Sequence, residues 1–387
     1  MDGPAEPLLE HRHTTLHQAA RALQATLEPL ERRAEEDVRG ASKAAIRALA
    51  QADLLKSVIP KSYGGAFDRP EVRALVSIRE GLAYSGGLAD AMFALQGLGS
   101  LPLTLAGTDD QRKAWLPRVG KGSAIAGFAM TEPDAGSDPG AMQTRATKTL
   151  TGWEVSGTKT FISNAGIADY FVLFAKSDPN AGPKGITAFL LPGDAKGLST
   201  EPLRPMAPHP LGTLRMQKVQ LGRDAMIGGE KEGLRLALQT LDLMRPTVAA
   251  AACGLAARAL VEALKRSQAR RQFGHPIGEN QGLRWRLAEA ATDLQAARLL
   301  VHRAAWLKDL GQDRITFESA QAKLFATEAA QRIVDVALQI HGGTGVMQGH
   351  VVERLYREVR ALRIYEGTSE ILRDIVAKGL FEGAAKR

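Results

Sequence analysis

The spacing of apolar residues changes twice along this chain of 387 residues, and this change limits the folds that it can adopt. Up to about residue 126, apolar residues recur every three or four positions, as in 16–30 and 75–105, which predicts helices. From Ala124 onward, β-branched and aromatic residues alternate with polar ones, as in WEVSG, DYFVLFAKS and LRMQKVQL, which predicts several short strands. From about Lys231 the helical spacing returns in long segments.

The predicted fold class is therefore α+β, with three domains along the chain. We expect an α-helical domain at 1–126, an antiparallel β-barrel or sandwich at 127–230 and a helical bundle at 231–387. Strands and helices do not alternate, and the sequence has neither GxGxxG after a strand nor GxxxxGK[ST]. Nicotinamide dehydrogenases and nucleotide triphosphatases of the usual kinds are thus disfavoured.

Cysteine and hydropathy limit the compartment. The one cysteine, Cys253, cannot form an internal disulfide, which suits a reducing compartment and excludes zinc-ribbon metal sites. We find no apolar run of the 18 to 20 residues that a membrane span needs, and the start, MDGPAEPLLEHRH, matches neither a signal peptide nor a transit peptide. We therefore expect a cytoplasmic protein with no membrane partner, although the mitochondrial matrix remains open.

The positive charge is concentrated in the C-terminal part of the chain. The net charge is +1 for residues 1–230 and +7 for residues 231–387. Such an excess fits nucleic acid, an anionic carrier or a phosphate-rich cofactor. On charge alone, a solvated helix surface is the explanation that we favour.

Two segments at the predicted β-domain carry possible ligand contacts. The first, FAMTEPDAGSD at 128–138, is a polar turn whose small residues let a ligand approach the backbone. The second, KTFISNAG at 159–166, places Phe161 and Ser163 on the same face of a strand. An aromatic ring beside a hydroxyl suits a flat heteroaromatic ligand, although each feature alone is also common in ordinary turns and cores.

Two further motifs lie in the C-terminal part. ARRQFGHPIGENQ, at 269–281, is a basic loop whose arginine side chains match phosphate oxygens. Alternatively, these cations interact with the negative end of the dipole of the preceding helix. QIHGGTG, at 339–345, is followed by RIYEGTSEI at 363–371. In the latter, the carboxylate of Glu366 precedes a helix start, where free amides can receive an anion.

These segments, with IPKSYGG at 59–65, occur in the order and spacing of the acyl-CoA dehydrogenase family, which the chain resembles over nearly its whole length. The resemblance implies an N-terminal helical domain, a middle β-domain, a C-terminal four-helix bundle and bound FAD. The residues that it implies for FAD binding are Met130, Thr131, Phe161, Ser163, Arg270, Gln272, Phe273, Gln339, Gly342, Gly343 and Thr368. Several of these would reach the FAD of a neighbouring subunit, so we expect a homotetramer or homodimer.

By the same resemblance, Glu366 is the catalytic base. It would remove a proton from Cα of an acyl thioester while hydride leaves Cβ for flavin N5. The backbone amide of Glu366 and an FAD hydroxyl would bind the thioester oxygen. Some relatives carry the base at the position of Met244, which leaves Glu366 as the only candidate here. The implied substrate contacts are Ser137, Asp242, Arg245, Tyr365, Gly367, Ala91 and Ala94, with Arg245 ordering the backbone of the active site.

Two positions depart from the family pattern or are unusual within it. His209 lies between two prolines in a segment that differs from relatives, and we interpret it as a loop residue. Asp90 falls near the closed end of the implied acyl tunnel. There its carboxylate either turns to solvent or a neighbouring cation, which we favour, or meets a polar group of the substrate.

The leading functional hypothesis is FAD-dependent α,β-dehydrogenation of an acyl-CoA, with an electron-transfer flavoprotein as acceptor. Alternatives within enzymes are an acyl-carrier-protein dehydrogenase or an oxidase, since fold alone does not determine substrate. A helical nucleic-acid-binding protein on the same scaffold would explain the positive charge, but it would not need Glu366. We therefore expect no nucleic-acid partner and no metal.

Overall fold

The predicted order of helices, strands and helices is confirmed by the structure, a computed structural model that describes residues 8–384. The strands of the main sheet begin at Ala126 and end at Ile227, and the next helix begins at Gly233. The chain forms two compact units. The first combines the described parts of Met1–Arg32 and Asp242–Arg387 with Glu71–Asp90, and the second combines Arg33–Pro70 with Ala91–Leu241.

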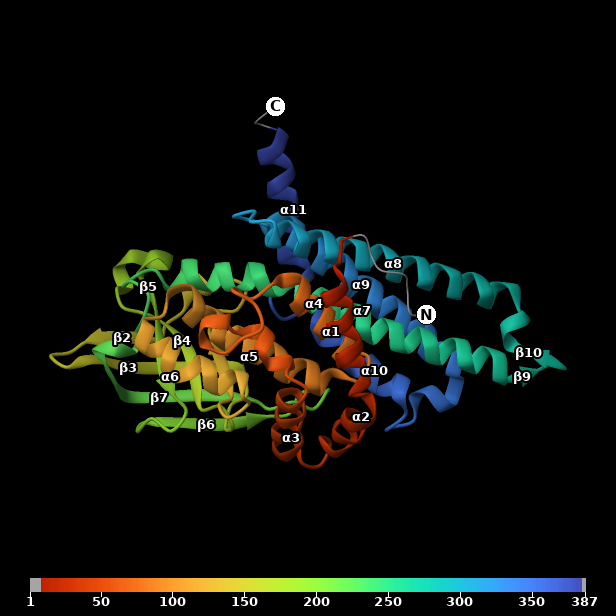
Figure 1. Ribbon diagram of the computed structural model, residues 1–387, viewed down its shortest axis with the longest axis horizontal. Coiled ribbons are helices and arrows are strands. Elements are labelled where there is room, and N and C mark those ends of the chain that lie inside the picture. Colours follow the sequence, from red (N-terminus) through yellow and green to blue (C-terminus); the bar gives the residue numbers. More distant parts are fainter. Residues whose placement is uncertain (1–7, 385–387) are drawn as a thin grey trace. The chain divides into compact units, whose positions relative to one another are not determined.

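The first unit is built mainly from helices (Figure 1). These are α1 (His11–Ala22), α2 (Gln24–Arg33), α4 (Val72–Ala83), α7 (Gly233–Ala269, from Asp242 on), α8 (Gln281–Asp309), α9 (Thr316–His341), α10 (Val351–Leu362) and α11 (Ser369–Ala384). Helix α4 packs against α1 and α8, whereas α9 packs against α8, α10 and α11. A short hairpin, β9 (Arg271–Gln272) with β10 (His275–Pro276), follows α7.

Small side chains allow the helices of this unit to approach closely. The run from Val248 to Ala257 in α7 is buried throughout the unit's core. A Cβ atom on Gly254 would lie 2.3 Å from the carbonyl oxygen of Glu80, so α4 and α7 touch at a point that only glycine permits. At the surface the usual amphipathic spacing returns, because Val352, Leu355 and Val359 form the buried face of α10.

The second unit packs helices with the main sheet. Its helices are α3 (Val38–Gln51), α5 (Gly87–Ala106, from Ala91 on) and α6 (Asp109–Gly120). The strands are β1 (Ala126–Ala129), β2 (Arg145–Lys148), β3 (Gly152–Ser163), β4 (Tyr170–Lys176), β5 (Ile186–Pro192), β6 (Leu198–Leu203), β7 (Leu211–Gly222) and β8 (Met226–Ile227). They pair in the order β6-β7-β3-β2-β4-β5-β8, and β1 pairs with β4 in parallel.

The alternating side chains of these strands form the core of the sheet, as the sequence predicts. Trp153, Phe171 and Phe189 are almost fully buried there. The rings of Trp153 and Phe189 meet edge to face, with centroids 5.1 Å apart. One pairing is parallel over four residues and a second, between β2 and β4, over one, whereas the others in the sheet are antiparallel.

Two helices contradict the expectation that no apolar segment is as long as a membrane span. Helices α5 and α7 are long and apolar enough to cross a membrane by length and composition. However, 83% and 78% of their most apolar windows are buried inside the protein. This burial is typical of core helices, so the two helices are weak indications of a membrane span.

Candidate active site

The turn between α10 and α11 carries Glu366 in an unusual backbone conformation. Glu366 has a φ of 55° and Gly367 a φ of 104°, so two successive residues adopt the left-handed region. Glycine reaches this region easily, but a glutamate there is uncommon and costs free energy. Non-glycine residues of this kind concentrate at functional sites, where surrounding contacts hold them in place.

Two cations of the first unit hold the carbonyl groups of this turn. The Nε of Arg245, on α7, donates a hydrogen bond to the carbonyl oxygen of Glu366 at 3.2 Å. The Nζ of Lys323, on α9, donates to the carbonyl oxygen of Gly367 at 2.7 Å. Because both carbonyl groups are held, the peptide planes on either side of Gly367 have limited freedom to turn. The sequence predicts the role of Arg245 but gives no motif for Lys323.

Asp242 orients Arg245. One carboxylate oxygen of Asp242 accepts a hydrogen bond from Nη1 of Arg245 at 2.7 Å, and the other accepts from Oγ1 of Thr316 at 2.5 Å. Thr316 begins α9, so this chain of bonds joins α7 to α9. That Asp242 contacts the substrate stays a prediction. In the structure, Asp242 positions the guanidinium of Arg245.

The carboxyl group of Glu366 lies near charged groups, and one of its two oxygens has no hydrogen-bond partner among the described residues. Its Oε2 atom is buried and has no hydrogen-bond partner within residues 8–384. Burial raises the pKa of Glu366, while the cations of Arg79, Lys323 and Arg245 oppose the rise and Asp90 adds to it. A carboxylate with a raised pKa and an open oxygen is suited to accept a proton.

Asp90 pairs with a neighbouring cation, which is one form of the alternative that we favour from the sequence. Arg79, on α4, donates from Nε to Oδ1 of Asp90 at 2.7 Å and from Nη2 to Oδ2 at 2.6 Å. Its Nη1 donates to Oγ1 of Thr247 at 2.8 Å. Both charged side chains are buried, so Asp90 does not reach solvent. Burial raises the pKa of Asp90, and the paired guanidinium opposes that rise.

The predicted flavin contacts of the second unit lie together at an irregular point of the sheet. The register of β3 against β7 shifts between Lys159 and Ile162, and within this shift Phe161 has a φ of 55° and is 64% exposed. The amide of Thr160 donates to the carbonyl oxygen of Thr131 at 2.9 Å, which brings Thr131 beside Phe161.

This group of residues fits the isoalloxazine part of FAD. Among the residues that the structure describes, the hydroxyl groups of Thr131 and Ser163 have no hydrogen-bond partner. An exposed aromatic ring flanked by free hydroxyl groups offers stacking to a flat ring and hydrogen bonds to its polar edge. The structure therefore brings together Met130, Thr131, Phe161 and Ser163.

A buried ion pair that the motif analysis does not identify holds this group. The Nζ of Lys159 lies 2.8 Å from Oε1 of Glu132 and donates to the carbonyl oxygen of Met130 at 2.9 Å. Glu132 also accepts hydrogen bonds from the amides of Gln143 and Thr144. Burial lowers the pKa of Lys159 to about 8, which the Glu132 carboxylate opposes. The sequence signal for this pair is a single lysine two positions before the FIS segment.

The residues predicted to bind the rest of FAD lie in the first unit at two exposed segments. Arg270, Gln272 and Phe273 follow α7, and Phe273 is 95% exposed with a φ of 53°. Gln339, Gly342 and Gly343 lie at the end of α9, also exposed. Over residues 8–384 no hydrogen bond or ion pair engages the guanidinium of Arg270. A Cβ at either glycine would meet open space, which leaves room for a ligand.

The remaining predicted contacts have varied surroundings. Thr368 accepts a hydrogen bond from the amide of Ile371 at 3.3 Å and so caps α11. Tyr365 is 40% exposed beside Glu366. Ser137 is exposed, Ala91 half-buried and Ala94 buried in the second unit. The assignments of these residues stay predictions. His209 lies in the loop between β6 and β7, as expected.

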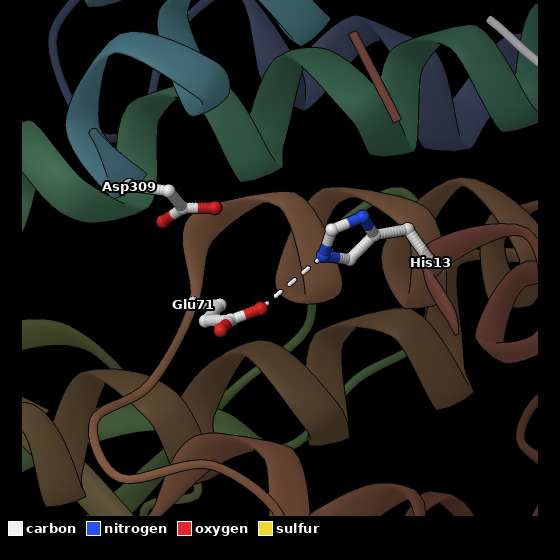
Figure 2. Close-up of side chains that lie close together, drawn as sticks. All are labelled: His13, Glu71 and Asp309. Carbon is white, nitrogen blue, oxygen red and sulfur yellow. Dashed lines mark hydrogen bonds and ion pairs between the residues drawn. The ribbon is translucent and has the colours of Figure 1, made fainter. Parts of the chain in front are cut away.

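His13, Glu71 and Asp309 form the one cluster in the described part of the chain with the spacing of a metal site (Figure 2). Nε2 of His13 lies 3.2 Å from Oε2 of Glu71. However, Asp309 already accepts hydrogen bonds from the amides of Val72 and Arg73 and from Nε of Arg73. These hydrogen bonds from Val72 and Arg73 are those of a structural cluster that joins α1, α4 and α8.

Comparison with known proteins identifies the family of the chain. Models of the acyl-CoA dehydrogenase N-terminal, middle and C-terminal domains match residues 10–123, 127–219 and 231–381. The chain is 38% identical over 344 residues to a 3-(aryl)acrylate reductase of Clostridium sporogenes, covering 88% of this chain and 90% of the relative. It is 33% identical over 335 residues to a cyclohexane-1-carbonyl-CoA dehydrogenase of Geobacter metallireducens, covering 86% and 87%.

A solved structure gives the same result. Butyryl-CoA dehydrogenase from Megasphaera elsdenii superposes with a TM-score of 0.90 at 30% identity, covering 98% of this chain and 100% of that one. Three observations therefore lead to the same family. Several residues fit a flavin ring, a buried carboxylate is suited to take a proton, and family models match all three domains. The chain belongs to the acyl-CoA dehydrogenase family and is an FAD-dependent oxidoreductase that acts on CH–CH bonds of acyl thioesters.

Proposed function

We propose that this protein oxidises an uncharged acyl-CoA to the 2-enoyl-CoA, with Glu366 as the base that removes the α-proton. The observation that carries the proposal is the buried, unpartnered Oε2 of Glu366 on a turn held by Arg245 and Lys323. FAD, when bound, supplies the hydride acceptor. Proton removal breaks the Cα–H bond and forms an O–H bond at the Glu366 carboxylate.

The chain supports this step in two further ways. Holding the carbonyl groups of Glu366 and Gly367 fixes the two peptide planes that follow Glu366. The amide of Glu366, which is the candidate donor to the thioester oxygen, lies in the plane just before this fixed turn. A fixed donor at a developing oxyanion is worth roughly 3 to 4 kcal/mol in related chemistry. The raised pKa of Glu366, caused by burial, makes its carboxylate a stronger base than an exposed glutamate.

The ion pair between Arg79 and Asp90 supports an acyl group without a charged end. Because Arg79 and Asp90 neutralise each other, neither presents a free charge to a substrate. A charged acyl end would lose its hydration without gaining a counter-ion, and such a loss is costly. We therefore favour short to medium acyl groups without a charged end.

The partners of the protein are proposed from its charge distribution and from two exposed segments. The excess of +7 in residues 231–387 supports binding of a phosphate-rich thioester such as CoA. The exposed segments at Arg270 and Gln339 support a homodimer or homotetramer in which they contact FAD of a neighbouring subunit. An electron-transfer flavoprotein is the proposed electron acceptor.

Anaerobic flavin bleaching tests the proposed function. The purified holoprotein is mixed with straight-chain, branched and cyclic acyl-CoAs and with a carboxylated one, and flavin absorbance is followed. We expect bleaching by at least one uncharged acyl-CoA and at least about tenfold slower bleaching by the carboxylated one. Bleaching only by a carrier-protein thioester would refute the CoA assignment, and rapid reoxidation by air would favour an oxidase.

A further inference from the structure

Lys323 is a buried cation that no sequence motif identifies. Lys323 is 0% exposed, and it lies in α9 among alanine and other apolar residues. Burial lowers the pKa of its ammonium group to about 8, and the Glu366 carboxylate opposes this fall. Removing a charged group from water is costly, so its place in the fold needs a compensating interaction.

The carbonyl oxygen of Gly367 supplies that interaction. Nζ of Lys323 lies 2.7 Å from this oxygen, a short distance for an N–H···O hydrogen bond, as expected when the donor is charged. The two residues are 44 positions apart in the chain, so the contact exists only because α9 packs beside α11.

The hydrogen bond from Lys323 is made at a turn with an unusual backbone conformation. Glu366 and Gly367 have φ values of 55° and 104°, and a left-handed glutamate must be stabilised by contacts around it. Arg245 holds the carbonyl group before Gly367 and Lys323 the one after it. Loss of either donor leaves one side of the turn free to relax toward an ordinary conformation.

We infer that Lys323 is a positioning residue for Glu366. Its ammonium group fixes the Gly367 carbonyl, and with it the turn that carries the carboxylate of Glu366. The positive charge also favours the ionised form of that carboxylate. This inference rests on the proposed function, because it assumes that Glu366 is the base.

The charged groups that face Glu366 come from four helices. They are Arg79 on α4, Asp90 on α5, Arg245 on α7 and Lys323 on α9, and Arg79, Lys323 and Arg245 all oppose protonation of Glu366. The base acts only when ionised, so flavin reduction slows as pH falls through the pKa of Glu366. Removing one of the three cations therefore moves this acidic limb to higher pH.

The test compares K323M and K323Q with K308M in the holoprotein. Methionine keeps the length of the side chain without donor or charge, whereas glutamine keeps an N–H donor. Lys308, at the end of α8, is a matched control because its Nζ also donates to backbone carbonyl oxygens, those of Gln312 and Asp313. FAD content and the midpoint of thermal unfolding are recorded for each variant.

The readout is the rate of anaerobic flavin reduction by an acyl-CoA as a function of pH. We expect K323M to lose at least about tenfold in rate at pH 7 and to show its acidic limb at higher pH. K323Q should recover part of the rate but keep the displaced limb, and K308M should match the parent protein. An unchanged limb in K323M refutes the inference, even if the rate falls, because a purely structural loss does not alter the titration of Glu366.

If K323M yields no holoprotein, K323Q decides by the same criterion. E366Q is measured alongside to separate this inference from the proposed function. Reduction at the parent rate in E366Q means that the base assignment fails. Loss of reduction in E366Q, with parent behaviour in K323M and K323Q, refutes the role of Lys323 alone.

Discussion

Arg79 and Asp90 form a bidentate ion pair inside the first unit, with Nε···Oδ1 at 2.7 Å and Nη2···Oδ2 at 2.6 Å. Arg79 also bonds Thr247, whose hydroxyl donates to the carbonyl oxygen of Met244 in α7. The pair is therefore joined to the helix that carries Arg245. An unpaired Asp90 would have offered a charge to a substrate, whereas the observed pair offers none.

Asp90→Asn should destabilise the protein, because Arg79 is then left buried without its counter-ion. We expect the free energy of unfolding to fall by about 3 to 5 kcal/mol, measured by urea denaturation. A double variant, Arg79→Met with Asp90→Leu, should recover most of this loss, since both charges of the buried pair are then removed. A change within about 0.5 kcal/mol for Asp90→Asn would show that the pair contributes little.

The same variant tests whether Asp90 recognises the acyl group. Because its carboxylate is already bound by Arg79, we expect Asp90→Asn to change the preference among uncharged acyl-CoAs by less than about tenfold, or roughly 1.4 kcal/mol. The measurement is kcat/KM for straight-chain and branched acyl-CoAs with both proteins. Activity limited to a polar or carrier-bound acyl group, and lost in the variant, would contradict the expectation.

Glu366→Gln should retain FAD and bind thioester but lose flavin reduction by at least about 100-fold, the scale expected for removal of a positioned general base. Glutamine keeps the size of the side chain and cannot take the α-proton. Single-turnover bleaching measures the rate. Glu370→Gln, at an exposed position of α11, is the matched control and should bleach normally. Normal bleaching in Glu366→Gln would place the base elsewhere.

Glu31 should make the protein less stable as the pH rises. Burial raises the pKa of Glu31 to about 8, with Glu358 adding to the rise and Arg354 opposing it. Above the ordinary value of 4.5 the unfolded chain loses a proton that the folded protein keeps. The free energy of unfolding therefore falls as pH rises from about 4.5 to 8.

Glu31→Gln removes this contribution, so its free energy of unfolding should decrease less between pH 5 and pH 8 than that of the parent protein. Glutamine retains an oxygen for the amide of Leu88, which Glu31 binds at the start of α5. Glu36→Gln, at an exposed carboxyl, serves as the control. Equal pH slopes for parent and Glu31→Gln in urea denaturation would rule out a titrating Glu31.

Arg270→Ala should release FAD and weaken the oligomer together. The guanidinium of Arg270 has no partner among residues 8–384, as expected of a group that binds phosphate across a subunit boundary. Flavin absorbance after gel filtration and mass by light scattering measure both effects. Arg215→Ala, which removes an exposed arginine of β7, should change neither. A stable monomer that retains FAD would contradict the proposal.

Local signals account for the parts of the site that the sequence identifies. Phe161 and Glu366 lie in motifs that suggest ligand contacts, whereas the roles of Glu366 as base and of Arg245 follow from the resemblance to the family. The sequence contains much weaker signals for Lys159, which stands between two threonines, and for Lys323, a lone lysine among apolar neighbours. It gives no sign that Phe161, Phe273 and Glu366 adopt left-handed backbone conformations, because none of them is a residue type that favours this region.

The periodicity of apolar residues by itself determined the order of helices and strands, because one buried face requires a period near 3.6 in a helix and 2 in a strand. Tertiary packing alone decided which charges meet. Arg79 pairs with Asp90 after the chain turns between α4 and α5, and Lys323 reaches Gly367 across 44 residues. Burial and charge neighbours set the proton affinity of Glu366, and both depend on segments distant in the sequence.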